Sequence, residues 1–213
     1  MSPSLAIFIF VVILVVGGFA LGTHRNVRRG HDAMAWVQGG LPLVGEKTTL
    51  RWLGSSVVQL KIQNAKRPFR EAEVLFVLEP RDIAPLWWLA RVRGRRDLFI
   101  FRSRMHKLPE FEFEAFEPKA WSARGREAQL RHQKWQPLTG RDSLLAYAPE
   151  PLPTANSLLD LAALSGCPLM RLSIQRHDPN FEVHWPLAEL TKLPASTVFE
   201  TLRQLGQQAG AHS

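Results

Sequence analysis

Residues 1–23 read MSPSLAIFIFVVILVVGGFALGT and contain no charged side chain. Residues 3–21 are almost wholly aliphatic and aromatic, and they lack the polar stripe found on the solvent-exposed face of a helix in a soluble protein. As a helix, this run would extend for about 28 Å, close to the thickness of the hydrocarbon core of a bilayer. The stretch therefore predicts a single transmembrane helix, with the rest of the chain folded on one side of the membrane.

The flanking charges predict the orientation of this helix. Arg25, Arg28 and Arg29 follow the apolar run directly, and no Lys or Arg precedes it. Because the side richer in Lys and Arg stays in the cytoplasm, we expect the N-terminus outside and a cytoplasmic C-terminal domain at the cell membrane. The alternative is a signal peptide cleaved near residues 18–20, although its basic leading segment is missing and its apolar core is long. The lone cysteine, Cys167, fits a reducing compartment.

The net charge of +8 is unevenly distributed along the chain. Residues 24–143 hold 23 Lys and Arg against 13 Asp and Glu, whereas residues 144–213 hold 4 against 6. The basic excess therefore belongs to the part nearest the predicted membrane helix. An anionic cytoplasmic leaflet would attract such a surface, and the alternative is ordinary solubility charge.

Composition and patterning divide the chain into five segments. These are a transmembrane anchor (1–23), a juxtamembrane connector (24–45), a β-rich module (46–116), a polar linker (117–142) and an α+β module (143–210). The predicted fold class is thus one transmembrane helix followed by a cytoplasmic α+β region.

The β-rich module shows five strand patterns at close spacing. They cover residues 48–53, 57–62, 71–79, 97–104 and 111–115. The first two flank a turn at residues 54–56 and predict a hairpin. In the last one, Phe113 alternates with Glu112 and Glu114, which predicts a half-buried strand with both acids in water. Five short strands with turns between them predict a small sandwich or barrel.

The last third of the chain has a different pattern. Residues 143–147, 170–174 and 181–187 predict strands, and residues 157–164 and 197–209 predict helices. The second helix opens with Thr197-x-x-Glu200, which is a capping box. The order β-α-β-β-α predicts a module with both helices packed on one side of a sheet.

No set of residues predicts catalysis, a metal or a cofactor. The segment around Gly40 and Gly45 departs from a phosphate-binding loop, because Glu46 stands where the lysine belongs. His177 and His184 lie in a turn and on a polar strand face, where solvated side chains are expected, and structural zinc needs more ligands. Nucleic acid is an unlikely partner, because the basic residues form no recognition helix.

One segment combines tryptophans with arginines. It contains Trp87, Trp88, Arg91, Arg93, Arg95 and Arg96 between two predicted strands. Such a segment can lie at the membrane interface, with the indole rings at headgroup depth and the arginines on phosphates. The alternative is that Trp87 and Trp88 are core residues of a helix that crosses the domain surface.

A pair of glycines offers a second candidate contact. Gly18 and Gly22 are four residues apart near the inner end of the predicted membrane helix, a spacing that permits close approach of a second helix. It predicts pairing with a protein partner or with a second copy of the chain.

Together these patterns favour a membrane-anchored, non-enzymatic scaffold, adaptor or accessory subunit of a membrane complex. Two alternatives remain open. One is a lipid- or ligand-binding domain at the inner membrane face, and the other is an enzyme whose site is assembled from scattered residues.

Overall fold

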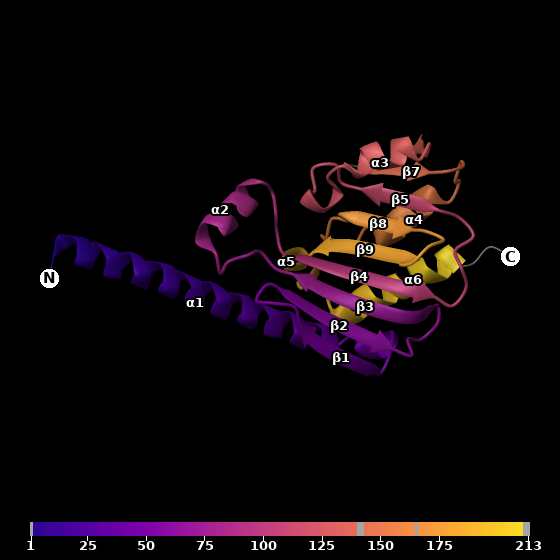
Figure 1. The fold of residues 1–213 in the computed structure, drawn as a ribbon. Helices are drawn as coiled ribbons and strands as arrows, with labels where there is room; N and C mark the ends of the chain where they lie inside the picture. The colour runs from indigo at the N-terminus through magenta and orange to yellow at the C-terminus, as the bar shows by residue number, and fades with distance from the viewer. Residues whose placement is uncertain (1, 140–142, 165, 211–213) are drawn as a thin grey trace.

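One long helix, α1 (Pro3–Gln38), projects from the folded domain (Figure 1). The computed structural model describes residues 2–139, 143–164 and 166–210. The connector expected over residues 24–45 is therefore helical as far as Gln38. Gly30 lies inside the helix and packs closely on Trp52, because a Cβ at this position would lie 2.4 Å from the Trp52 ring.

The domain is built on one nine-stranded sheet in which each strand pair is antiparallel. The strands are β1 (Lys47–Trp52), β2 (Val57–Gln63), β3 (Phe69–Val77), β4 (Leu98–Met105), β5 (Phe113–Phe116), β6 (Gln136–Leu138), β7 (Leu145–Ala148), β8 (Arg171–Ile174) and β9 (Phe181–Pro186). Their order across the sheet is β1-β2-β3-β4-β9-β8-β5-β7-β6. The hairpin predicted at residues 48–62 is confirmed as β1 and β2.

The predicted sandwich or barrel is wrong, because the sheet is open and single. Strand β4, from the first predicted module, pairs with β9, from the last third of the chain. The register runs from Leu98 opposite Pro186 to Ser103 opposite Phe181. The backbone hydrogen-bonding groups at the β4 edge of the first four strands are thus paired with β9. The first four strands therefore form part of an open sheet and do not close into a barrel.

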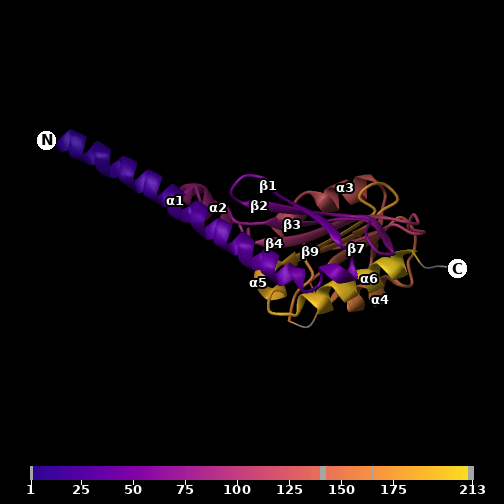
Figure 2. The ribbon, with the colours of Figure 1, turned by 90° about the horizontal axis from the view of Figure 1, so that it is seen from below.

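Helices cover one face of this sheet. α4 (Ala155–Ala162), α5 (Leu187–Leu190) and α6 (Ala195–Gly210) lie on the same side as the C-terminal part of α1 and the short helix η1 (Leu41–Leu43) (Figure 2). The core between the layers consists of alternate strand residues such as Leu60, Phe101 and Val183. The predicted order of strands and helices in the last third is confirmed by β7, α4, β8, β9 and α6.

Among the residues that the structure describes, the other face is covered at one end. There η2 (Trp121–Ala123) and α3 (Arg126–His132) pack on a small second core around Leu98, Phe116 and Leu130. The stretch expected to be a polar linker thus supplies a buried leucine, two short helices and strand β6. The remaining helix, α2 (Ala84–Val92), lies between β3 and β4 in the chain and lies away from the sheet, at the end of the domain from which α1 projects (Figure 1).

Candidate functional site

The first half of α1 has almost no contact with the domain. Its large apolar side chains from Leu5 to Leu21 are exposed, and only 6% of its most apolar 18-residue window is buried. By length and composition, α1 is long and apolar enough to cross a membrane. A core helix of a soluble protein would instead bury these residues, so the exposed half of α1 is not a core helix in this structure.

The second half of α1 is docked along one face. Gly22, Asn26, Gly30, Ala33 and Val37 are buried, and their spacing of three or four residues places them on one side of the helix. A Cβ at Gly22 would lie 1.9 Å from the carbonyl oxygen of Arg81, so only glycine allows this approach. The docked half therefore continues without a break into the apolar half and fixes its direction relative to the domain.

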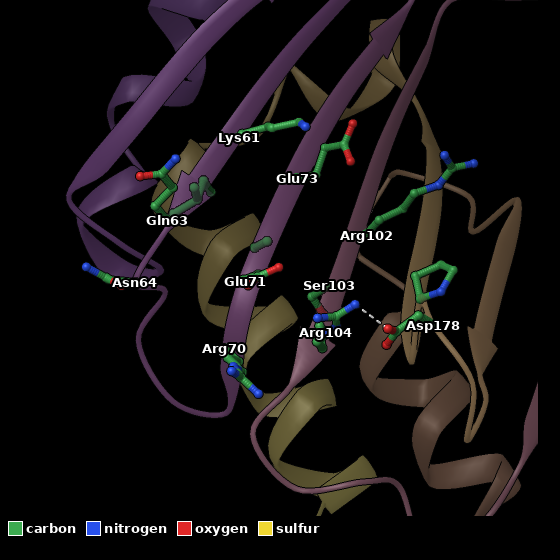
Figure 3. Close-up of a pocket in the computed structure, with 13 residues that line it drawn as sticks. Lys61, Gln63, Asn64, Arg70, Glu71, Glu73, Arg102, Ser103, Arg104 and Asp178 are labelled. Atoms are coloured by element: carbon green, nitrogen blue, oxygen red, sulfur yellow. Dashed lines mark hydrogen bonds and ion pairs between the residues drawn. The ribbon is translucent and has the colours of Figure 1, made fainter.

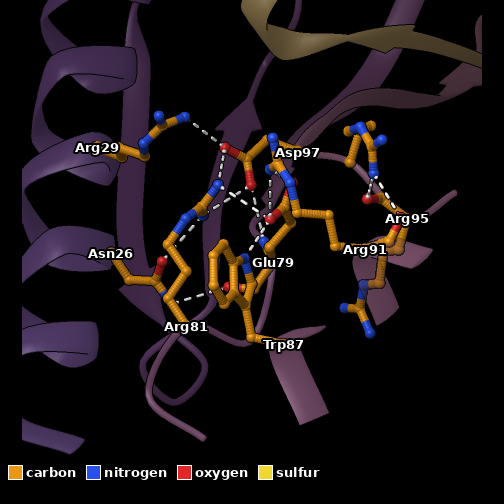
Figure 4. Close-up of polar contacts among 9 residues, drawn as sticks. Asn26, Arg29, Glu79, Arg81, Trp87, Arg91, Arg95 and Asp97 are labelled. Carbon is orange, nitrogen blue, oxygen red and sulfur yellow. Dashed lines mark hydrogen bonds and ion pairs between the residues drawn. The ribbon is translucent and has the colours of Figure 1, made fainter. Parts of the chain in front are cut away.

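Two buried acids hold this junction together (Figure 4). Asp97, at the start of β4, accepts two hydrogen bonds from Arg81 at 2.9 and 3.0 Å and one from Arg29 of α1 at 2.8 Å. The backbone N–H of Glu79 donates to the same carboxylate at 2.7 Å. Charge-assisted, bidentate contacts of this kind are the stronger class of hydrogen bond.

Asn26 and Glu79 complete the cluster. The side-chain amide of Asn26 donates to the backbone oxygen of Glu79 at 3.0 Å, and its oxygen accepts from Arg81 at 3.1 Å. The Glu79 carboxylate accepts from the indole N–H of Trp87 and from Arg91 at 3.2 Å. The cluster thus ties together α1, the ends of β3 and β4, and α2.

Helix α2 turns its polar contacts inward and its apolar side chains outward. The side chains of Trp87 and Arg91 point toward the domain and donate hydrogen bonds to Glu79. No residue of α2 is fully buried. The outward apolar side chains are those of Ile83, Leu86, Trp88, Leu89 and Val92, and that of Trp88 is 64% exposed. Trp88 is therefore not a core residue in this structure, whereas Trp87 is half-buried against Glu79. This arrangement is the reverse of an ordinary surface helix, which packs its apolar side on the protein.

The predicted arginines have different environments. Arg91 pairs with Glu79, the Arg95 guanidinium lies 4.9 Å from the centre of the Trp121 ring, and Arg96 donates to backbone oxygens at the end of α2. In the described part of the chain, Arg93 has no side-chain partner. Of the juxtamembrane arginines, Arg29 pairs with Asp97, while Arg25 and Arg28 are exposed.

The two glycines of the predicted pairing site also differ. A Cβ at Gly18 would meet nothing within 4 Å, whereas Gly22 is occupied by its contact with the backbone of Arg81 and Asp82. Pairing of α1 through both glycines stays a prediction. Any such partner would have to approach on the Gly18 side, because the domain already covers Gly22.

A second polar cluster lies on the sheet face beneath α3, and it overturns two expectations. Glu114 is fully buried rather than in water, and it accepts hydrogen bonds from Arg126, Arg171 and Gln175. His184 is buried rather than solvated. Strand alternation places Glu114 on the correct face, but it cannot show that α3 covers that face.

His184 and Glu182 form a contact of 2.7 Å within this cluster. Burial lowers the pKa of His184, despite the opposing effect of Glu182. Burial raises the pKa of Glu182, but the hydrogen bond with His184 and the charges of Arg171 and Arg102 outweigh it and lower the pKa to about 2. These groups bind one another, although the buried Nδ1 of His184 has no hydrogen-bond partner among the described residues.

A shallow hollow of about 810 Å³ lies on the uncovered sheet face, far from α2 (Figure 3). Its floor is formed by β2, β3 and β4, and its wall by the turn at Asp178 and Pro179. Lys61 and Glu71 are exposed in it, whereas Arg104 pairs with Asp178. Charges of both signs are thus available to a polar ligand or a partner surface.

Metal and thiol chemistry has little support in the described residues. Among them, no group of three or more His, Cys, Asp or Glu side chains is placed to hold a metal ion. Cys167 is buried, and burial raises the pKa of its thiol to about 12. A thiol with so high a pKa is a poor nucleophile at neutral pH.

The junction of α1 and α2 includes residues that the sequence did not point out. Asn26, Glu79 and Asp97 carry most of its hydrogen bonds. No protein-family model matches this sequence, and no curated protein matches it. The arguments for function therefore rest on the geometry of this junction.

Proposed function

We propose that the chain is a membrane-anchored, non-enzymatic protein, acting as a scaffold, adaptor or accessory subunit at the inner face of the cell membrane. In this proposal α1 spans the bilayer, and α2 lies in the interface beside the point where α1 leaves it. The observation that carries the proposal is the reversed orientation of α2, whose apolar side points away from the domain next to the exposed half of α1.

The outward side of α2 suits the interface energetically. Four large apolar side chains of α2, together with that of its N-cap residue Ile83, are each between 38% and 67% exposed. Burying them in the interface would contribute about 5 kcal/mol, from about 1.5–3 kcal/mol for each side chain if it were fully buried. A tryptophan such as Trp88 is well suited to the headgroup region, because its ring is apolar and its N–H is polar.

Two contacts with the bilayer would fix the orientation of the domain. α1 alone leaves rotation about its own axis free, whereas α1 and α2 together define one membrane-facing end. The opposite end, with the hollow lined by Lys61 and Glu71, would then be held away from the lipid. A fixed, outward-facing polar sheet face is what a scaffold or adaptor presents to a partner.

The hollow supports a second candidate function, a ligand-binding domain at the inner membrane face. Its volume falls in the range of small-molecule sites, and its lining is polar and bears both charges. Its shallow, open shape favours a partner surface over an enclosed small molecule.

Fluorescence quenching of the full chain in vesicles tests the contact of α2 with lipid. Brominated acyl chains quench tryptophans that reach the bilayer, and the difference between the native chain and Trp88→Phe isolates the signal of Trp88. We expect strong quenching of Trp88. A signal from Trp88 that bromine leaves unchanged would contradict the proposal.

Orientation needs a separate measurement in cells. A reporter that is active only in the cytoplasm should work when it is fused after Ser213, because Arg25, Arg28 and Arg29 favour the cytoplasmic side. Activity of an export-dependent reporter at the same position would reverse the topology and support the signal-peptide alternative.

A further inference from the structure

The junction of α1 and α2 carries more positive charge than its acids neutralise. Residues 22–30 and 79–97 together contain eight arginines and three acids, a balance of +5. The buried acids Glu79 and Asp97 are already shared by Arg29, Arg81 and Arg91. In the described part of the chain, five arginines of the junction have no acidic partner: Arg25, Arg28, Arg93, Arg95 and Arg96.

These cations lie on the two elements that the junction joins, α1 and the end of α2. Arg25 precedes Arg29 by one helical turn, and Arg29 reaches Asp97 on the flank of α1 that faces α2. Arg93, Arg95 and Arg96 follow the last turn of α2, directly beyond the outward-facing Val92. The unpaired charges of α2 therefore lie at the end of its apolar side, and Arg25 and Arg28 lie within about two helical turns of the membrane-length segment of α1.

We propose that this arginine ring binds the headgroups of anionic phospholipids in the bilayer that α1 spans. The inference rests on the proposed function, because the arginines reach headgroup phosphates only if the apolar side of α2 lies in the interface. The guanidinium groups can donate to phosphate oxygens, because Glu79 and Asp97 are already occupied by other arginines and Asp82 accepts from the hydroxyl of Ser55. The ring thereby recruits anionic lipid around the exit of α1.

The sequence alone suggests a different set of arginines. Arg91 belongs to the Trp–Arg segment, but its charge is neutralised by Glu79, so it holds α2 in place rather than binding lipid. Arg25 and Arg28 belong to α1 and join this set only because α1 is docked on the domain through Asn26 and Arg29. The ring is thus defined by which arginines remain unpaired.

A lipid-competition experiment on the full chain tests the proposal. Vesicles contain equal amounts of phosphatidylglycerol and phosphatidylcholine, and the bromine label is placed first on one lipid and then on the other. The signal of Trp88, again taken as the difference from Trp88→Phe, then reports which lipid lies beside α2. We expect at least about a 5-fold preference for the anionic lipid, the factor that corresponds to a single cation at an anionic surface.

A matched pair of triple variants separates this site from general charge. Arg28→Gln, Arg93→Gln and Arg96→Gln remove three ring charges and leave Arg25 and Arg29 to maintain topology. Lys61→Gln, Arg67→Gln and Arg70→Gln remove three exposed charges at the far end of β2 and β3. The preference should fall clearly in the ring variant, which keeps only Arg25 and Arg95 of the five ring arginines, and should remain at the native value in the control.

Each other outcome has a distinct meaning. Equal quenching by the two lipids in the native chain would overturn headgroup binding and leave the interfacial position of α2 intact. Equal loss in both triple variants would also overturn it, because net charge rather than the ring would then set the preference. No quenching of Trp88 by either lipid would instead overturn the proposed function.

Discussion

Asp97→Asn offers the sharpest test of the cluster that fixes α1 and α2 to the domain. The substitution keeps the size of the side chain but removes the charge that faces Arg29 and Arg81. Arg29 is more than half exposed and can be solvated, whereas the side chain of Arg81 is only 11% exposed and would be left without its bidentate partner. Removing one partner of a buried ion pair typically costs about 3–5 kcal/mol.

Two features of the site place the expected loss near the lower end of that range. Glu79 remains 3.5 Å from Arg81, and the new amide still offers one oxygen to the surrounding donors. We therefore expect Asp97→Asn to lower the free energy of unfolding by about 3 kcal/mol. The assay is urea unfolding of the full chain in micelles, followed by tryptophan fluorescence.

Asp178→Asn is the matched control for this experiment. Asp178 pairs with Arg104, but both side chains are about half exposed, so the pair contributes less than about 1 kcal/mol. If Asp97→Asn destabilises the protein no more than Asp178→Asn does, the cluster does not hold the junction together. The account of how α2 is oriented would then lose its basis.

Three further predictions concern the docking, the pH dependence and the modularity of the domain. Gly22→Val should undock α1 and lower the urea midpoint, because its Cβ collides with the backbone of Arg81, whereas Gly18→Val should leave the midpoint unchanged. The free energy of unfolding should fall as the pH drops below 6.5, because burial lowers the pKa of His184 in the folded protein and the unfolded chain therefore takes up the proton first. It should fall further below pH 4.5, because the unfolded chain then protonates Glu182, whose folded pKa is about 2. Urea titrations at several pH values check this, with His184→Gln expected to remove the first step and a flat profile contradicting it. Finally, the pairing of β4 with β9 predicts one cooperative unfolding transition and no stable 143–210 fragment after limited digestion with trypsin. Early cleavage within residues 117–142 that releases such a fragment would instead support two separate modules.

Local patterns in the sequence predicted most of the elements. Alternation of apolar residues located the strands, and apolar spacing located α6; the capping box was wrong, because α6 begins at Ala195 and Thr197 lies inside it. These signals are local, because each depends on a few neighbouring side chains. The apolar run at residues 3–21 was equally visible, and α1 contains it in full.

Pairing between distant segments was not predictable in the same way. β4 and β9 are about eighty residues apart, and no residue in either strand specifies the other as its neighbour. Two groups of strands therefore looked like two modules, although they form one sheet. Glu114 shows the same limit on a smaller scale, because Arg126 and Arg171 reach it only after distant segments have packed.

The candidate site was predicted in part. The Trp–Arg segment was recognisable, but its pattern did not show which side of α2 would face the domain. Glu79 decides this by accepting from Trp87 and Arg91, and its carboxylate belongs to a cluster that α1 also joins. The same cluster decides which arginines remain free, so the headgroup site could be defined only from the structure.

Spin-label depth measurement tests most directly the central claim that α2 lies in the membrane interface. Val92 in α2 and Leu108 after β4 are almost equally exposed, at 67% and 63%, and each can be replaced by cysteine in the full chain. The buried Cys167, whose thiol pKa is raised to about 12, should not compete for a nitroxide label. In vesicles, the account predicts that the label at position 92 collides with oxygen dissolved in the bilayer and is shielded from a water-soluble nickel chelate, whereas the label at position 108 shows the reverse. Equal accessibility of both labels to the nickel chelate would contradict the claim.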